Sequence, residues 1–270
     1  MFHSFAAADL HINIKTSPIF EVGGFAITNA MITGTISLIL FVAIFVYVAR
    51  MVKLARYNRF VGLVQWAFEG MLSQVHSVIP DEKAARKIAP LALTIFFYVL
   101  ISYWMSIIPG LESITYEGKP LLRSIAADLN FTFALAFISL VVTQIFAIRQ
   151  HGNWGNLKRY LRNPLKDPIG AFEGALELVG EASRYAALSL RLFGNCFAGE
   201  VLLLIITVLS GYFAGLALPA FMAFELFIGF IQAYVFFILT IIFTSLALES
   251  HGEAHSDHSP ADTKLVTQHE

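Results

Sequence analysis

The stretch LSLRLFGNCFAGE, Leu188–Glu200, places an arginine, an asparagine and a glutamate inside a run of residues that otherwise suits lipid. An arginine at the centre of a membrane costs about 2.5 to 3.5 kcal/mol on insertion scales, so it is rarely kept without a use. The surrounding apolar run extends over 171–209, which is long enough to cross a bilayer core of about 30 Å. The stretch therefore predicts a membrane helix with polar residues of functional importance.

The composition of the whole chain agrees with a membrane setting. Hydrophobic residues make up 57% of the 270 residues, 25 of them are phenylalanine, and only 14% are charged. The mean hydropathy is +0.69. These values exclude an ordinary soluble domain. The single Cys196 excludes a disulfide or a cysteine-based metal site within the chain.

Five apolar segments are long enough to span a bilayer. They lie at about 26–49, 89–108, 128–147, 171–209 and 219–248. The chain is therefore predicted to be an all-α polytopic membrane protein with about five crossings. We expect a single membrane domain, 1–270, made of an outer N-terminal segment, a helical membrane region and a polar inner tail, at 1–25, 26–248 and 249–270.

The positions of lysine and arginine predict the orientation. Basic residues concentrate in the loops 50–87 and 149–166, whereas only Lys15, Lys119 and Arg123 fall on the other side. The positive-inside rule then places the N-terminus outside and the C-terminus inside. Within the first basic loop, residues 59–79 carry apolar side chains at helical spacing, so we expect an amphipathic helix on the membrane surface.

The last two apolar segments are longer than a perpendicular crossing needs. At 1.5 Å per residue they reach about 58 Å and about 45 Å, against a layer of about 30 Å. Such lengths require steep tilt. We therefore predict a long slanted hairpin with its turn within SGYFAGLALP, residues 210–219.

Helical spacing divides the polar residues of the fourth segment between two faces. Arg184 and Arg191 are seven residues apart and share a face, and Asn195 follows Arg191 by four. Glu200, nine residues after Arg191, points to the opposite side. Arg191 is surrounded by apolar residues and has no acid within four positions, which disfavours a purely structural role. For Arg184, nearer the inner end, snorkelling or capping is an equally good interpretation.

The fifth segment carries a second polar pair. Glu225 and Gln232 are seven residues apart and share a face. Counted back from the turn, Glu200 and Glu225 come at similar depth on antiparallel neighbours, nearer the outer surface than Arg191. This predicts an acidic pocket open to the outside. The alternative for Glu200 and Glu225 is a neutral, hydrogen-bonded structural pair. The alternative for Asn195 and Gln232 is a purely structural interhelical hydrogen bond.

These segments also carry a family resemblance. LSLRLFGNCFAGE, followed by IQAYVFFILTIIFTSLALESH, resembles subunit a of rotary F-type ATP synthases, and so do PLALTIFFYVLISYW, ADLNFTFALAF and EGALELVGEASRYAALSLRLFGN. The likeness covers about 85–250 well and the first 80 residues more loosely. It implies that Arg191 is the stator arginine facing the ring of c subunits, with Asn195, Glu200 and Gln232 as polar residues of the proton path. Glu225 occupies a position where relatives carry histidine or another polar residue.

The resemblance extends to polar residues outside this motif. It implies that Asp128 and Asn130 help line the outer entrance, and that Glu177 and Arg184 belong to the inner half-channel. Where some relatives have asparagine and aspartate near the end of the second span, this chain has Tyr103 and Ser106. We therefore assign those two residues no proton role from the sequence.

The function implied is that of a proton-translocating stator with two offset half-channels. Its partners would be the c-subunit ring, the b-subunit peripheral stalk, other synthase subunits and lipid, with no nucleic acid, no cofactor, no metal and no catalytic site of its own. The expected location is a bacterial inner membrane, with a mitochondrial inner membrane as the alternative. A competing interpretation is a secondary transporter or channel subunit that binds an anion at Arg191, although the chain shows no internal repeat.

The C-terminal tail is rich in histidine and acidic residues. A weak metal site at His251, His255 and His258 is conceivable, but the composition favours a solvated disordered tail. The coupling ion, H⁺ or Na⁺, is largely set by the ion site of the c subunit, and this sequence predicts neither the ring stoichiometry nor the dominant direction of the reaction.

Overall fold

A computed structural model describes residues 18–108, 114–116, 119–160 and 168–249. The segments 1–17 and 250–270, and with them most of the expected outer N-terminal segment and polar tail, lie outside the described residues. The elements in chain order are β1 Pro18–Val22, β2 Phe25–Thr28, α1 Asn29–Lys53, α2 Arg59–Val78, α3 Glu82–Ser106, β3 Thr115–Tyr116, β4 Lys119–Pro120, α4 Leu129–Tyr160, α5 Pro168–Ser210, η1 Gly211–Phe213 and α6 Ala214–Glu249.

Five of the described helices are long and apolar enough to cross a membrane, as predicted. They are α1, α3, the Leu129–Arg149 part of α4, α5 and the Ala214–Leu248 part of α6. The sixth helix, α2, is not among them. It buries Val61, Val64 and Val75 and exposes Trp66. This two-sided pattern fits the predicted amphipathic helix, whose place on the membrane surface stays a prediction.

Several helices extend beyond the apolar segments that the sequence predicts. α3 begins at Glu82 rather than 89, since Asp81 accepts a hydrogen bond from the backbone N–H of Lys83 at 3.0 Å, and Pro90 lies inside the helix. Similarly, α6 begins at Ala214 and includes Pro219. α4 continues to Tyr160 through two glycines, each of which costs a helix only about 1 kcal/mol.

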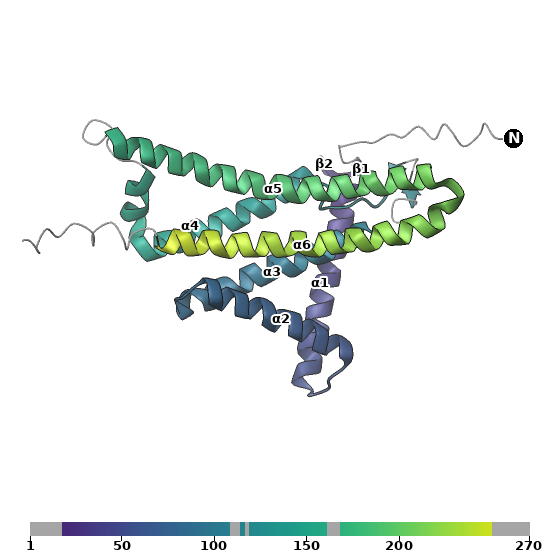
Figure 1. Cartoon of the computed structure of the whole chain (residues 1–270), viewed down its shortest axis with the longest axis horizontal. Helices are drawn as coiled ribbons and strands as arrows, with labels where there is room; N and C mark the ends of the chain where they lie inside the picture. The colour runs from purple at the N-terminus through teal and green to yellow at the C-terminus, as the bar shows by residue number, and fades with distance from the viewer. Residues whose placement is uncertain (1–17, 109–113, 117–118, 161–167, 250–270) are drawn as a thin grey trace, which may run out of the picture.

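The last two helices form the predicted hairpin. α5 has 43 residues and α6 has 36, and they run antiparallel side by side with η1 at the turn (Figure 1). Gly211 has φ +46° in this turn, a conformation that favours glycine. In the same view α1 crosses the hairpin at a steep angle. Both cannot stand upright in one membrane, and the lengths of α5 and α6 favour the hairpin as the tilted element.

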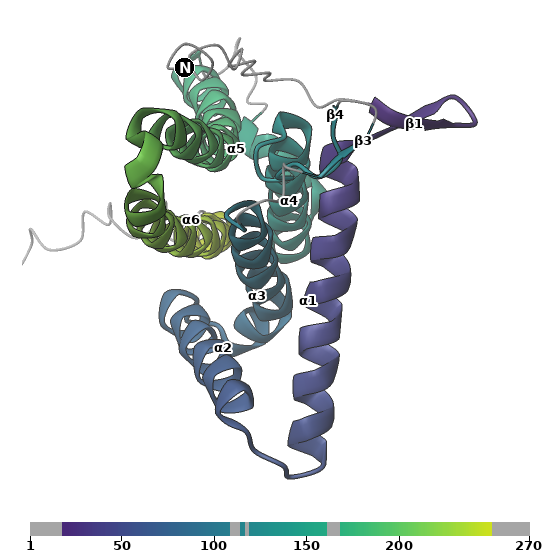
Figure 2. The same ribbon diagram turned by 90° about the vertical axis from the view of Figure 1, so that its right-hand side faces the viewer.

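The four helices α3, α4, α5 and α6 form one bundle, and Figure 2 looks nearly along them. α1 is seen at full length beside this bundle. The core is formed by side chains with at most 1% exposure, among them Phe96 of α3, Leu188 and Leu192 of α5, and Phe236 and Phe237 of α6. These contacts hold α5 and α6 in place along their length.

Hydroxyl pairs tie α4 to the hairpin inside the bundle. The Ser139 hydroxyl donates a hydrogen bond to Thr240 Oγ1 at 3.1 Å, and the hydroxyls of Thr143 and Thr244 form a hydrogen bond at 3.0 Å. Ser189 of α5 donates to Thr132 at 3.1 Å. Interhelical bonds of this kind contribute on average about 0.6 kcal/mol in membrane proteins, so their main effect is to fix how the helices are aligned.

The segment between α3 and α4 packs over the beginning of α1. The Asn29 side chain donates to the carbonyl of Pro120 at 3.2 Å, and the Arg123 backbone N–H donates to Thr33 Oγ1 at 3.1 Å. Ile125 lies against Gly34, where an added Cβ would collide with it. These contacts bring the residues after β4 to the same end of the molecule as β1 and β2 (Figure 2).

Candidate functional site

Arg191 lies near the middle of α5 on a face that the rest of the chain leaves uncovered. Its side chain is exposed, whereas Leu188 and Leu192 are 1% and 0% exposed. Arg184 and Asn195 are also exposed, in agreement with the shared face that their spacing predicts. Within the described residues the Arg191 guanidinium has no hydrogen-bond or ion-pair partner. A positive charge is therefore presented to whatever lies beside this face.

Asn195 and Gln232 connect the two long helices next to Arg191. Asn195 Nδ2 donates to Gln232 Oε1 at 2.8 Å. Gln232 is 2% exposed, and its Nε2 has no partner among the described residues. A buried donor without a partner costs about 1 to 3 kcal/mol. Gln232 Nε2 is therefore left as a donor for an acceptor that is not among the described residues.

Glu225 is buried against α5 and α3. Its carboxyl Oε1 accepts a hydrogen bond from the Tyr103 hydroxyl at 2.6 Å, and the two residues are 4% and 0% exposed. A Cβ added at Gly199 would collide with the Glu225 carboxyl, and one added at Gly229 would collide with the Tyr103 ring. No proton role was assigned to Tyr103 from the sequence, because it departs from the residues that the resemblance would place there. Its partner lies 122 positions away, so the contact became visible only in the packing of α3 against α6.

Glu200 lies on the same side of the hairpin as this pair. It follows Cys196 by one helical turn, is partly exposed, and acts electrostatically on both Tyr103 and Cys196. Cys196 itself contacts Ser124 Oγ at 3.2 Å and Ser106 Oγ at 3.8 Å. The structure therefore gathers two carboxyl groups around Tyr103, toward the turn end of the hairpin, and connects this region to the segment before α4.

Asp128 and Asn130 stand at the beginning of α4. Asp128 Oδ1 accepts from the Asn130 backbone N–H at 2.9 Å, and the Asp128 carbonyl accepts from the Thr132 N–H at 3.1 Å. Asp128 therefore caps the helix. Asp128 is half-buried and Asn130 is exposed, and in the described part of the chain neither is hydrogen-bonded to Tyr103 or Glu225. Their expected role at an entrance stays a prediction.

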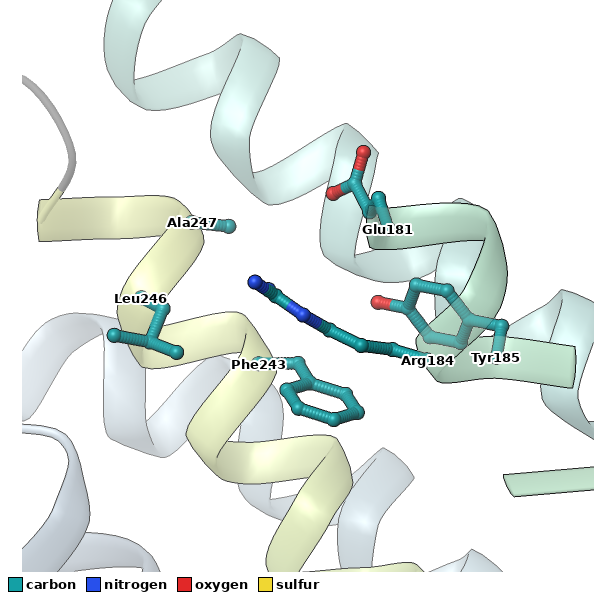
Figure 3. A pocket seen from close by; sticks show the side chains of 6 residues that line it. All are labelled: Glu181, Arg184, Tyr185, Phe243, Leu246 and Ala247. Atoms are coloured by element: carbon teal, nitrogen blue, oxygen red, sulfur yellow. The ribbon is translucent and has the colours of Figure 1, made fainter. Parts of the chain in front are cut away.

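A second polar group lies toward the open end of the hairpin. Gln144 of α4 donates from Nε2 to Glu181 Oε1 at 2.6 Å. The Arg184 guanidinium carbon lies 5.6 Å from the centroid of the Phe243 ring, a cation–π contact. Figure 3 shows the Arg184 side chain extending over Phe243, with Glu181 and Tyr185 beside it.

This group encloses a cavity of about 10 Å³ lined by Glu181, Arg184, Tyr185, Phe243, Leu246 and Ala247. That volume is about what one water molecule needs. Glu177, which the sequence predicts for this region, is partly exposed but does not line the cavity. Glu181 was missed because helical spacing alone does not single it out; its spacing of three from Arg184 was the available clue.

No group of three or more metal-ligating side chains occurs in the ranges that the structure describes. The histidines His251, His255 and His258 lie outside those ranges. The chemistry visible in the described residues is therefore that of carboxyl, amide and hydroxyl groups on both sides of one exposed arginine.

Comparison with known proteins identifies the family. A family model described as ATP synthase A chain matches residues 30–245. The chain is 38% identical over 189 residues to a protein named ATP synthase subunit a from Mycobacterium leprae, covering 69% of this chain and 72% of that relative. It is 33% identical over 247 residues to a protein of the same name from Chromobacterium violaceum, covering 81% and 89%. With its five apolar helices and bacterial relatives, this multi-pass membrane protein belongs to the ATP synthase A chain family.

Proposed function

We propose that this chain is the proton-translocating stator subunit of a bacterial F-type ATP synthase. In this role it gives the carboxylates of a rotating c-subunit ring access to two offset half-channels. The observation that carries the proposal is the exposed guanidinium of Arg191, which has no partner within the described residues, on a face of α5 whose neighbouring positions are buried. A charge kept at that depth requires a partner from outside the chain.

The expected partner is a carboxyl group on the ring. In lipid such an acid is neutral, because desolvation raises the pKa of a buried carboxyl by about 3 to 5 units. At about 4 Å from a guanidinium, the attraction on the ionised form is on the order of 4 kcal/mol at an effective dielectric constant of 20. This attraction corresponds to about 3 pKa units. Passage beside Arg191 therefore drives the ring acid to release its proton.

The outer half-channel would be formed at the turn end of the hairpin. Glu225 and Glu200 carry protons there, Asn195 and Gln232 bind the water next to Arg191, and Asp128 and Asn130 lie toward the entrance. The support for this path is the short Tyr103–Glu225 bond and the unpartnered Nε2 of Gln232. A chain of such groups lets a proton move without placing an isolated charge in lipid.

The inner half-channel would be formed at the open end. Its candidates are Glu177 and Arg184, to which the structure adds Glu181 with its water-sized cavity. The two groups of carboxyls lie on opposite sides of Arg191 along α5, Glu181 ten residues before it and Glu200 nine residues after it. A proton can then pass from one path to the other only by travelling around the ring.

Arginine suits the barrier between the paths because it stays protonated at any relevant pH, whereas a buried lysine can lose its proton. Each proton that falls through 100 mV releases about 2.3 kcal/mol, which rotation of the ring transmits to partner subunits. We propose that the chain has no catalytic site of its own, lies in the inner membrane with its N-terminus outside and C-terminus inside, and also contacts the b-subunit peripheral stalk.

The test is ATP-driven proton pumping by membrane vesicles that contain the complete complex with Arg191→Ala or Arg191→Lys. We expect both variants to assemble and neither to pump. Assembly is measured as the amount of subunit a that purifies with the c ring, and wild-type vesicles give the reference rate. An Arg191→Ala complex that still pumps would contradict the proposal and favour the alternative of an anion-binding transporter or channel subunit.

A further inference from the structure

Tyr103 and Glu225 form a short hydrogen bond between two buried side chains. The phenolic O–H of Tyr103 on α3 donates to Glu225 Oε1 on α6 at 2.6 Å, and both side chains are at most 4% exposed. Distances of 2.5 to 2.7 Å are typical of hydroxyl groups that donate to a carboxylate, which are among the stronger hydrogen bonds in proteins.

Two glycines make room for the pair. Gly199 on α5 leaves space for the Glu225 carboxyl, and Gly229 on α6 leaves space for the Tyr103 ring; a Cβ at either position would collide with its neighbour. The carboxyl is thus enclosed by α5 on one side and by the tyrosine on the other.

The neighbours of Glu225 on α6 point the other way. Phe224 and Phe227 are 55% and 59% exposed, so the exposed face of α6 lies beside Glu225 and not under it. Without a hydrogen bond on the inner side, the carboxyl could be hydrated, or could contact the c-subunit ring, by turning toward that face. The bond to Tyr103 holds it inward, on the side of the hairpin that Glu200 shares.

We propose that Tyr103 is a positioning residue of the outer proton path: it holds Glu225 inward and determines which of its carboxyl oxygens carries the transferred proton. Since Oε1 accepts from Tyr103, a proton arriving from outer water binds Oε2 and leaves from Oε2 to the next acceptor. Tyr103 keeps its own proton throughout. This inference rests on the proposed function, because it assigns Glu225 to the transport path.

The test is passive proton conduction through the membrane sector of the complex, measured after the ATP-hydrolysing sector has been removed from the vesicles. Tyr103→Phe deletes only the hydroxyl and keeps the ring against Gly229. Losing a hydrogen bond to a charged group is expected to slow conduction about tenfold or more. The matched control is Tyr98→Phe on the same helix, whose hydroxyl donates to the Gly34 carbonyl of α1 at 3.4 Å and not to Glu225; we expect it to conduct like wild type.

A double variant separates positioning from a structural role. Glu225→Gln keeps an acceptor oxygen for Tyr103 but cannot carry a proton. If Tyr103 acts through the carboxyl, adding Tyr103→Phe to Glu225→Gln causes no further loss. The same loss in both backgrounds would mean that the hydroxyl only stabilises packing and would overturn the inference.

The pH profile of conduction gives a second reading. Among the described residues, the titratable side chains around the pair are Cys196 and Glu200 on α5, and neither is changed. Tyr103→Phe is expected to displace the profile along the pH axis, whereas a purely structural defect lowers the rate equally at every pH. A uniform fall would overturn the inference.

If Tyr103→Phe reduces assembly, Gly199→Ala tests the same point from α5. The added methyl group would collide with the Glu225 carboxyl, and we expect the same slow conduction in an assembled complex; wild-type conduction would contradict the inference. Arg191→Ala is measured for ATP-driven pumping in parallel. Loss of pumping there, together with wild-type behaviour of Tyr103→Phe, would overturn only the role of Tyr103. Retained pumping in Arg191→Ala would overturn the proposed function itself.

Discussion

Asn195 of α5 and Gln232 of α6 are joined by a 2.8 Å hydrogen bond one helical turn beyond Arg191. The contact between Gly199 and Glu225, one further turn toward the hairpin end, belongs to the same antiparallel alignment. The two long helices are therefore aligned by polar contacts next to the exposed arginine, in addition to the apolar core behind them.

Gln232→Leu should break this alignment locally. The free energy of unfolding should fall by less than about 1 kcal/mol, because one interhelical bond is lost and Asn195 can bind elsewhere. ATP-driven pumping should fall much more, since the side-chain amide that we propose to act in the proton path beside Arg191 is lost. The measurement is the pumping rate per assembled complex. The double variant Asn195→Gln with Gln232→Asn keeps the combined length of the two side chains and should recover part of the rate; no recovery would contradict this explanation.

Cysteine cross-linking should show which face of α5 meets the ring. Ala187 and Ala198 are exposed on the Arg191 face, whereas Leu188 and Leu192 are buried. In a Cys196→Ala background, cysteines at 187 and 198 should form disulfides with a cysteine placed near the c-subunit carboxylate. Cysteines at 188 and 192 serve as matched controls and should not. Higher yields at 188 and 192 than at 187 and 198 would mean that another face of α5 meets the ring.

Glu181→Gln should slow proton movement at the open end of the hairpin. The substitution keeps a side chain of the same length near Gln144 and removes the carboxyl group that we propose exchanges a proton at the cavity beside Arg184. We expect proton flow to fall by roughly tenfold or more, in both directions, because a positioned acid or base contributes at least that much to transfer. Glu173→Gln, on an exposed position of the same helix, controls for the change in charge and should have little effect.

Gly34→Val should destabilise the protein without changing the proton path. The added atoms collide with Ile125, and overpacking of this kind costs about 1 to 3 kcal/mol. The thermal stability of the purified complex should therefore fall while the pumping rate per folded complex stays near wild type. Gly70→Ala in α2, where an added Cβ meets nothing within 4 Å, should be neutral or slightly stabilising. A stable Gly34→Val complex would show that Ile125 can move aside.

The number of crossings and the long hairpin could be predicted because both follow from local properties. A run of apolar residues has no stable place in water, and its length in residues sets the thickness it can cross. The exact helix ends were harder to predict from the sequence. Asp81 extended α3 by capping it, and Pro90 and Pro219 proved compatible with helix interiors.

The candidate residues on α5 could also be chosen from the sequence, since a charged side chain in an apolar run is costly wherever it occurs. Their faces follow from helical periodicity, which correctly placed Arg184, Arg191 and Asn195 on one exposed side. Periodicity cannot show what approaches that side. Nor does periodicity pair Tyr103 of α3 with Glu225 of α6, although a buried tyrosine hydroxyl usually finds a hydrogen-bond partner.

The sequence by itself determined that the chain is a membrane protein with five apolar helices, a tilted terminal hairpin and an arginine at the centre of that hairpin. Composition and periodicity are properties of each segment, so they can be read without knowing which segments pack against it. Only the tertiary structure decided that Tyr103 meets Glu225, that Asn195 meets Gln232 and that Gln144 meets Glu181. These pairs depend on how α3, α4, α5 and α6 slide against one another, and a shift of one helical turn would separate every one of them.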